Sequence, residues 1–427
     1  MTTSDHVRLD IAIVGGGLIG SVVARVLREQ HNVTIYERAK TSSEFGAALG
    51  LGPTATLILE ELGLKNEHVK GVSLDITQVW GKNGKVVFER DMRAVRKQLG
   101  IKGEYILAHR RDWHNEFLRL ATAPSEELGI QGQPAKIIFG KEVVDVDPEK
   151  GELVFGDGTK VQADLIVAAD GIKSVLRPFV VGDAAYTTAR PSGLTAFRYT
   201  LPREEVIAAH DGKVPPMLQA DKPPLMTIVD AQDGSRRYVN MYACRDFELL
   251  NVVCMVPDSS LKSPTPESWT ATGDKKELLS HFDDFPDWLK VYMDIAEDHP
   301  KMWQLRDQDP LPSYVRGRMV LVGDAAHPMT PHQGQGATQG IEDAEAFRLF
   351  LSRYTLRPVT RGGVSDILKD IDSVRRPRAS QIQTHTRQIG KGFTTGDVFR
   401  YDRFNWRYPG IVEGVRRVQR GEPVQEL

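Results

Sequence analysis

The feature that most constrains this chain is a glycine cluster near its N-terminus. LDIAIVGG, residues 9–16, is an apolar run that predicts a buried parallel strand, and the GxGxxG sequence of residues 15–20 overlaps its end. A strand, this turn and a following helix form the context that a dinucleotide-binding fingerprint requires. Gly15 permits the tight turn, Gly17 lets the backbone approach a pyrophosphate, and Gly20 lets helix and strand pack closely. We therefore expect a dinucleotide at the N-terminus of the helix.

The end of the second predicted strand, NVTIYER, carries an acidic and a basic residue. Glu37 lies about 20 residues beyond the glycines, where a carboxylate accepts hydrogen bonds from an adenosine ribose. Arg38 leaves contact with a 2′-phosphate open, although the acidic neighbour favours an unphosphorylated ribose. A GxGxxA match beginning at Gly50 comes too soon to open another βαβ unit, and we interpret it as a loop near the dinucleotide.

Two more predicted strands end in a glycine and an aspartate. ADLIVAADGIKSVLR, residues 163–177, ends its strand at Asp170-Gly171 and predicts a short helix from Ser174 to near Arg177. The carboxyl ends of parallel strands are where α/β sheets bind ligands, although an ordinary turn also uses Asp-Gly.

The other strand end opens MVLVGDAAHPMTPHQGQGATQGIEDAEAF, residues 319–347. Asp324 is placed to accept hydrogen bonds from ribityl hydroxyls or to order water near a phosphate. Gly334 and Gly336 would let backbone amides approach a flat ring, and the helix after Gly336 offers its positive end to an anion. We interpret His327 as a structural residue of this loop rather than an acid or base.

The middle of the chain has the alternating pattern of an antiparallel sheet, in GLTAFRYTL, RRYVNMYAC and ELLNVVCMVP. The Pro-rich stretch GKVPPMLQADKPPLM predicts a loop over a site. A nucleotide-binding α/β domain is thus interrupted by a sheet and must be assembled from separated pieces.

Bulk properties exclude several classes of partner. The 55 basic and 57 acidic residues give a net charge of −2, which does not suggest nucleic acid binding. The apolar runs fall short of the ~18 residues that span a bilayer, so we expect no membrane segment. Two cysteines, Cys244 and Cys254, exclude a disulfide framework and favour a cytoplasmic setting, and we expect both thiols to be buried and inert. No Cys or His spacing predicts a metal site.

Together the three motifs, GGGLIG, DGIKSVLR and GDAAHPMTPHQGQGATQGIEDA, resemble those of the FAD-dependent class A flavoprotein monooxygenases. Within that family the chain is similar to the salicylate-hydroxylase-like group, which includes fungal aromatic-polyketide hydroxylases. YERAKTSSEFGAALGLGP, HRRDWHNEF and VRRPRAS add to the resemblance.

The resemblance implies an α/β fold with a Rossmann-like FAD-binding domain, an antiparallel β-sheet substrate domain and a helical C-terminal segment. We expect the FAD-binding domain in residues 1–75, 103–180 and 300–375. The sheet domain would take residues 76–102 and 181–299, and the C-terminal segment residues 376–427.

It also implies roles for individual residues. Glu37 would bind the adenosine ribose, Arg110 the phosphate region and Asp324 the ribityl-pyrophosphate part of FAD. Asp170-Gly171 would serve FAD and a passing NAD(P)H, for which the family has no separate Rossmann domain. The ring would be lined by Gly334, Gln335, Gly336 and Ala337.

Substrate residues are expected in the antiparallel sheet. Dearomatising phenol hydroxylases of the family use an Arg/Tyr pair, which Arg198 in LTAFRY and Tyr242 in MYACR would match. The segment departs from the family's Tyr-Pro-Cys-Arg-like pattern in having alanine at position 243. An arginine beside a phenolate or carboxylate would keep it ionised, and a tyrosine could relay a proton. A sheet ion pair stays open for Arg198 and is favoured for Arg245.

The resemblance predicts a monomeric or homodimeric enzyme that uses FAD, NAD(P)H and O₂ to hydroxylate a phenol or aromatic acid through a flavin C4a-hydroperoxide. One alternative is a flavin-dependent epoxidase or oxygenase of an indole or isoprenoid intermediate, which an all-apolar pocket would favour. Another is a non-catalytic binding protein on the same fold, against which the intact motifs argue.

Overall fold

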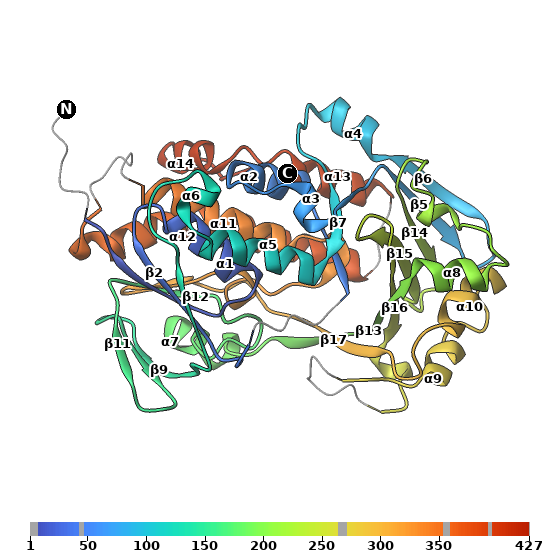
Figure 1. The fold of residues 1–427 in the computed structure, drawn as a ribbon, viewed down its shortest axis with the longest axis horizontal. Helices are drawn as coiled ribbons and strands as arrows, with labels where there is room; N and C mark the ends of the chain where they lie inside the picture. Colours follow the sequence, from blue (N-terminus) through green and yellow to red (C-terminus); the bar gives the residue numbers. More distant parts are fainter. Residues whose placement is uncertain (1–6, 42–46, 264–270, 353–358, 392–394, 427) are drawn as a thin grey trace.

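The computed structural model of the protein describes residues 7–41, 47–263, 271–352, 359–391 and 395–426, with the backbone alone for 395–399. Two large β-sheets organise the molecule and lie at opposite ends of its long axis (Figure 1). Long helices cover the first sheet, and short helices cover the outer face of the second.

Six strands from four separated stretches of chain form the first sheet. All neighbours are parallel except the short pair at one edge. In spatial order the strands are β18 (Val315–Arg316), β19 (Met319–Leu321), β12 (Leu165–Ala168), β1 (Asp10–Val14), β2 (Asn32–Glu37) and β8 (Lys136–Phe139). Their central members are nearly continuous apolar runs because both faces of the sheet are covered.

The alternation of side chains along β1 shows how each face of this sheet is covered. Ile11 and Ile13 join a core with the helices α1 (Leu18–Leu27), α5 (Arg110–Thr122) and α11 (Gly336–Phe350). Ala12 and Val14 join Leu153 and Phe155 on the other face, where a small sheet packs. Its strands are β9 (Val143–Asp147), β10 (Glu152–Phe155) and β11 (Lys160–Gln162), and a turn at residues 156–158 joins the last two.

Seven strands form the second sheet, which is antiparallel except where β14 pairs with β5. In spatial order they are β17 (Lys301–Asp307), β13 (Arg190–Pro202), β16 (Leu249–Pro257), β15 (Tyr238–Cys244), β14 (Leu225–Asp230), β5 (Ile76–Gly81) and β6 (Val86–Asp91). One face packs on α8 (Arg203–Ala209), α9 (Lys275–Ser280) and α10 (Asp287–Asp294). The other face carries Arg198 and Tyr242 and is turned toward the first sheet.

The region between the two large sheets is bridged by smaller elements and by the C-terminal helices. A third small sheet is made of β3 (Ala48–Leu51), β7 (Ile106–His109) and β4 (Val72–Ser73). Short helices are α2 (Pro53–Glu61), α3 (Asn66–Val69), α4 (Met92–Leu99), α6 (Ser125–Leu128) and α7 (Arg177–Val181). The C-terminal helices are α12 (Val364–Lys391), α13 (Thr395–Trp406) and α14 (Ile411–Gln419). Single 3₁₀ turns include η2 (Pro216–Leu218), η4 (Gly323–Ala325) and η5 (Pro331–Gln333).

The discontinuous α/β domain and the antiparallel sheet are confirmed, but two local predictions are wrong. The helix expected from Ser174 to Arg177 begins only at Arg177, because the chain first turns around the Asp170 carboxylate, which accepts from the N–H groups of Val175 and Leu176. The Pro-rich stretch is not a loop throughout, and its middle lies away from the inner face of the second sheet. Its Met217 and Leu218 are buried in the core on the helix-covered face of the second sheet, and its last residues begin β14.

Two expected domain boundaries also differ from the structure. Residues 301–307 form β17, which pairs with β13, so the boundary predicted at residue 300 falls inside the second sheet. The boundary at residue 375 cuts the single helix α12. Both errors arise because strand pairing and helix continuity depend on neighbours that are distant in sequence. Elsewhere the division into domains stays a prediction.

Within the described residues, no helix is both long and apolar enough to cross a membrane.

Candidate functional site

Each glycine of the turn after β1 has its own structural reason. Gly15 has a φ of +103°, and a Cβ built on it would lie 2.4 Å from the carbonyl oxygen of Ala169. A Cβ on Gly20 would lie 2.0 Å from the Gly15 carbonyl oxygen, so α1 packs directly on the turn. A Cβ on Gly17, by contrast, would meet no atom within 4 Å. Gly15 and Gly20 therefore serve the fold, whereas the space beside Gly17 is open for a ligand.

The carboxylate of Glu37 fixes this turn to the end of β2. One oxygen accepts from the Gly16 N–H at 2.8 Å, and the other accepts from the Ala39 N–H at 2.8 Å. Each oxygen can accept a further bond, so the ribose contact is compatible with the geometry and stays a prediction. Arg38 is exposed beside it, and its contact with a 2′-phosphate also stays a prediction.

Asp170 closes the second motif and keeps one oxygen for a ligand. Oδ2 accepts from the N–H groups of Val175 and Leu176 at 2.8 and 3.2 Å. Oδ1 is buried and has no hydrogen-bond partner among the described residues. Burial raises the pKa of this carboxyl, and the Ser174 side chain and the backbone donors oppose the rise. A buried acceptor without a donor is costly, so Oδ1 indicates a ligand hydroxyl or N–H group.

Arg177 joins the second motif to the third. Its side chain is fully buried, and Nε donates to the Ala325 carbonyl at 2.7 Å. Nη2 donates to the carbonyls of Asp324 at 2.8 Å and Ile172 at 3.0 Å. The guanidinium therefore fixes the spacing between the Asp170 turn and the Asp324 turn.

Arg110 lies near two predicted site residues from distant parts of the chain, Asp324 and Arg198. Burial raises the pKa of Asp324, while the charges of His327, Arg110 and Arg177 lower it. Burial also lowers the pKa of Arg198 to about 10, with repulsion from Arg110 adding to the effect and Tyr242 opposing it. Arg110, a predicted cofactor residue on α5, thus lies near Asp324 on η4 and also near the predicted substrate arginine on β13.

The loop before α11 packs on a residue that the sequence analysis did not single out. A Cβ on Gly50 would lie 2.4 Å from the Tyr105 ring, and a Cβ on Gly334 would lie 2.6 Å from the Tyr105 hydroxyl. Tyr105 therefore gives both glycines a structural reason, and the contact of Gly50 with the cofactor stays a prediction. Gly336 and Ala337 begin α11, where a Cβ on Gly336 would lie 3.8 Å from Asp324 Oδ1.

His327 belongs to a buried ionic network. Its Nε2 lies 2.8 Å from Asp343 Oδ2, which also accepts from the Gly323 N–H at 3.0 Å. Asp343 Oδ1 accepts from Arg375 Nε at 2.9 Å, and Arg375 also contacts Glu342 at 2.9 Å. This network links α12 to α11 and to the loop after β19. These contacts support a structural role for the histidine, and the absence of an acid or base role stays a prediction.

The inner face of the second sheet holds the two predicted substrate residues. Arg198 lies over the Trp303 ring at 5.5 Å, and its Nε has no hydrogen-bond partner among the described residues. The Tyr242 hydroxyl donates to the Ala48 carbonyl at 3.0 Å, which ties β3 to this sheet. Arg245 instead forms an ion pair with Asp112 at 2.9 Å, as the sequence favoured.

Comparison with known proteins decides the family. The chain matches the family described as "FAD binding domain" over residues 8–239 and 290–386, which is more than half of its length. The chain belongs to this family of FAD-binding monooxygenases.

Curated relatives of the flavoprotein span nearly its whole length. Hispidin-3-hydroxylase of Neonothopanus nambi is 32% identical over 385 residues, which are 87% of this chain and 86% of the relative. Salicylate hydroxylase of Pseudomonas putida is 31% identical over 404 residues, 91% of this chain and 87% of the relative.

Solved structures agree with this assignment. A salicylate hydroxylase substrate complex is 26% identical with a TM-score of 0.73, over 96% of this chain and 98% of the other. CtdE in complex with FAD and a substrate has a TM-score of 0.75 at 22% identity, over 90% of this chain and 89% of the other, and supports the fold alone.

The residues of this monooxygenase fit FAD. The open space at Gly17 offers a phosphate position, and the N-terminus of α11 offers a positive helix end. Oδ1 of Asp170, which has no partner among the described residues, offers a hydroxyl acceptor. The α11 terminus has no side-chain cap, so its first N–H groups are left for a ligand.

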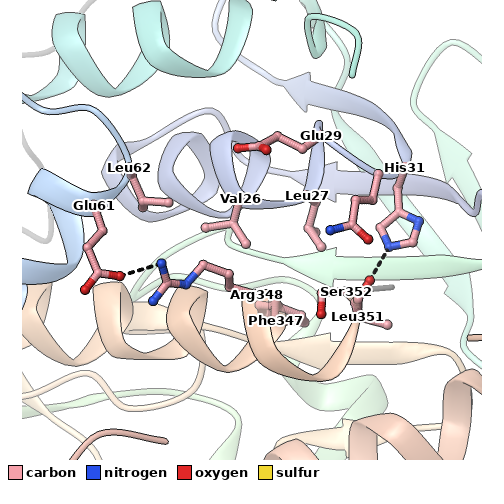
Figure 2. A pocket seen from close by; sticks show the side chains of 11 residues that line it. Val26, Leu27, Glu29, His31, Glu61, Leu62, Phe347, Arg348, Leu351 and Ser352 are labelled. Atoms are coloured by element: carbon pink, nitrogen blue, oxygen red, sulfur yellow. Dashed lines mark hydrogen bonds and ion pairs between the residues drawn. The ribbon is translucent and has the colours of Figure 1, made fainter. Parts of the chain in front are cut away.

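Other features of the flavoprotein lie outside this site. A cavity of about 210 Å³ lies between the ends of α1, α2 and α11, where Glu61 pairs with Arg348 (Figure 2). Cys244 and Cys254 are buried, and burial raises the pKa of each thiol to about 12, as inert cysteines require. Among the described residues, no three His, Cys, Asp or Glu side chains are grouped to hold a metal ion.

Three residues that help to build the site were missed from the sequence. Arg177 was noted only as a helix end, and Tyr105 gave no local signal. Trp406 of α13 lies close enough that a Cβ on Gly52 would be 3.8 Å from its Nε1, so the C-terminal segment forms part of the site wall. Only the spacing of the DGIKSVLR motif could have indicated one of them, Arg177.

Proposed function

We propose that this FAD-dependent monooxygenase hydroxylates a phenol or an aromatic acid, with NAD(P)H as reductant and O₂ as oxidant. The observation that carries the proposal is Arg198, a cation on the inner face of the second sheet whose Nε has no hydrogen-bond partner among the described residues. It lies near a second cation, Arg110. An anionic ligand would therefore offset both the cost of burying the Arg198 charge and its repulsion from Arg110.

The chain's own groups would bind the substrate and shield it. Arg198 would pair with the phenolate or carboxylate and keep it ionised, which makes the ring electron-rich. Reduced FAD supplies the activation of O₂. The N-terminus of α11 would stabilise negative charge on the ring system that it faces. Apolar residues beside Arg198 would keep water out, and they include Leu194, Ala196, Met255 and Leu305.

Tyr242 would act mainly as a positioning residue. Its hydroxyl donates to the Ala48 carbonyl, so it can accept a bond from a substrate hydroxyl without breaking that contact. Burial raises the pKa of Tyr242 far above its usual value, which keeps the phenol protonated at neutral pH.

The alternative is a flavin-dependent epoxidase or oxygenase of an indole or isoprenoid intermediate. Such a substrate would call for an apolar surface, and the inner sheet face here presents Arg198 and Asn240 instead, the second with Oδ1 lacking a partner among the described residues. Intact cofactor motifs argue against a non-catalytic binding protein.

A substrate screen tests the proposal. The purified yellow protein should be mixed with phenolic acids, polyketide phenols, indoles and terpenes, with NADH or NADPH. We expect phenolic acids or phenols to stimulate NAD(P)H consumption and to gain one oxygen atom by mass spectrometry. Stimulation confined to indoles or terpenes, with epoxide or diol products, would favour the alternative, and protein purified without flavin would contradict both.

A further inference from the structure

A basic cleft lies where the second sheet meets the C-terminal end of α12. Its volume is about 200 Å³, and it is bounded by the start of β13, the β14–β15 turn, the end of β17 and the last turns of α12. Cationic side chains reach it from three of these elements: Arg190, Arg236, Arg387 and Lys391. Of the three sequence motifs only the third reaches the cleft, through Thr330 and His332, and the proposed substrate and FAD contacts do not use the cations of the cleft.

The charges in this basic cleft do not cancel. Among the residues that the structure describes, Asp307 and Asp309 are the only carboxylates that line the cleft, and both pair with Arg387. Arg190 lies 3.7 Å from Asp309, a long and exposed contact. Four cations against two carboxylates leave an excess of two positive charges. Burial lowers the pKa of the lining His332 to about 4, so this histidine adds no charge at neutral pH.

Neutral donors also line the cleft. Thr330 is 4% exposed, and its hydroxyl has no hydrogen-bond partner among the described residues. Ser192 contributes a second buried hydroxyl, which also has no hydrogen-bond partner among the described residues. Arg236 has a left-handed backbone, with a φ of +62°, and its Nη2 donates to the Gly193 carbonyl at 3.3 Å. Unpaired hydroxyls beside excess arginine charge are the donor set that binds phosphate oxygens.

The cleft is connected to the loop that would carry the flavin ring. Thr330 is four residues before Gly334, and its carbonyl accepts from the Thr386 hydroxyl of α12 at 3.0 Å. His332 Nδ1 lies 3.2 Å from the Tyr238 hydroxyl, on the inner face of the second sheet. A ligand in the cleft would thus sit at the outer end of the loop whose inner end forms the ring site.

We propose that this basic cleft binds a phosphoryl group of NAD(P)H while its nicotinamide reaches the flavin. The inference rests on the proposed use of NAD(P)H, for which the described chain has no second glycine fingerprint in a βαβ unit. A phosphate monoester carries about −1.5 to −2 charges at neutral pH, which matches the excess in the cleft. The group is either the 2′-phosphate of NADPH or the pyrophosphate common to both dinucleotides.

The test removes charge from the cleft in the FAD-loaded enzyme. Arg190→Gln, Arg236→Gln and the double variant are compared with Arg316→Gln, an arginine of similar exposure that is outside the cleft. Dissociation constants are measured for adenosine 2′,5′-bisphosphate, inorganic pyrophosphate, NADPH and NADH, together with the KM of each reductant and the FAD content.

We expect the double variant to bind the phosphate probes at least about tenfold more weakly, because losing a hydrogen bond to a charged group weakens binding by about that factor. The KM should rise in parallel while FAD content stays at the wild-type level. A loss confined to NADPH and the bisphosphate assigns the 2′-phosphate, and an equal loss for NADH and pyrophosphate assigns the pyrophosphate. Binding within twofold of wild type, or an equal loss in Arg316→Gln, overturns the inference. The proposed function is judged separately, from FAD content and oxygenated product in the wild type.

Discussion

Arg177 Nη2 donates to the Asp324 carbonyl at 2.8 Å, and this contact joins two motifs that are 147 residues apart. The same side chain also donates to Ile172 and Ala325, so it sets the distance between the two strand ends. We therefore expect flavin binding to depend on Arg177, whose side chain is fully buried.

Replacing Arg177 by methionine should weaken folding and FAD binding together. The variant leaves several buried carbonyls without donors, and we expect a loss of more than about 3 kcal/mol in the free energy of unfolding. Urea titration and the flavin absorbance of the purified protein measure the two effects. Arg316→Met, at an exposed position, should change stability by less than about 0.5 kcal/mol. Normal FAD content in Arg177→Met would disprove the spacing role.

Gly15 and Gly17 should respond differently to valine. At Gly15 the side chain would strike the Ala169 carbonyl in a left-handed backbone, so Gly15→Val should fold poorly. At Gly17 the φ is −72° and the space is open, so Gly17→Val should keep its circular dichroism and thermal midpoint yet purify without flavin. A yellow, FAD-loaded Gly17→Val protein would place the pyrophosphate elsewhere.

Arg198→Met should impair substrate binding rather than FAD binding. Methionine can still pack on Trp303 but offers no charge to a phenolate. We expect the KM for an active phenolic substrate to rise about 10- to 100-fold, because the variant loses a hydrogen bond to a charged group. Lys301→Met is the matched control, because Lys301 pairs with Arg198 in the β13–β17 register and is exposed. Unchanged steady-state kinetics would leave Arg198 with a purely structural role.

His327→Asn should cost stability without changing the pH dependence of turnover. The substitution disturbs the 2.8 Å contact to Asp343, and we expect a loss of about 1–3 kcal/mol. Chemical denaturation and a pH profile of kcat from pH 6 to 9 provide the two measurements. If one limb of the profile disappeared while stability stayed constant, His327 would be an acid or base after all.

His385 should make the fold sensitive to mild acid. Burial lowers its pKa to about 4, and Arg400 and Arg378 add to the effect. In the unfolded chain His385 has a pKa near 6.5, so the unfolded state binds the proton first as the pH drops. The free energy of unfolding therefore falls between about pH 6.5 and pH 4, by up to about 1.4 kcal/mol per pH unit. His385→Phe, which can keep the stack on Tyr401, should lose less stability between pH 7 and 5 than wild type. Identical losses in the two proteins would show that His385 titrates normally.

The sequence predicted those parts of the site that are local in the chain. The turn at residues 15–20, the end of β2 at Glu37 and the start of α11 at Gly336 follow from glycine spacing and hydrophobic runs, and the structure has each of them. The prediction that Arg198 is a substrate residue, by contrast, came only from the family resemblance.

What could not be predicted depends on contacts between distant segments. Tyr105 fills the space beside Gly50 and Gly334, and no local pattern marks a tyrosine for that task. The error at residues 174–177 came from a helix propensity that the Asp170 carboxylate overrides by accepting backbone N–H groups. The boundary at residue 300 failed because β17 completes a sheet begun more than a hundred residues earlier.

Helix α12 has a consequence for recombining this enzyme with its relatives. Its first half holds the ionic network through Arg375, and its second half holds the loop at residues 328–330 and β17 through Gln383 and Arg387. A chimaera with a crossover near residue 375 would join the two halves of α12 from different parents. The contacts of Arg375 on one side, and those of Gln383 and Arg387 on the other, would then no longer come from one parent. Exchanging residues 364–391 as one block, along with the segments that they contact, would keep those pairings intact.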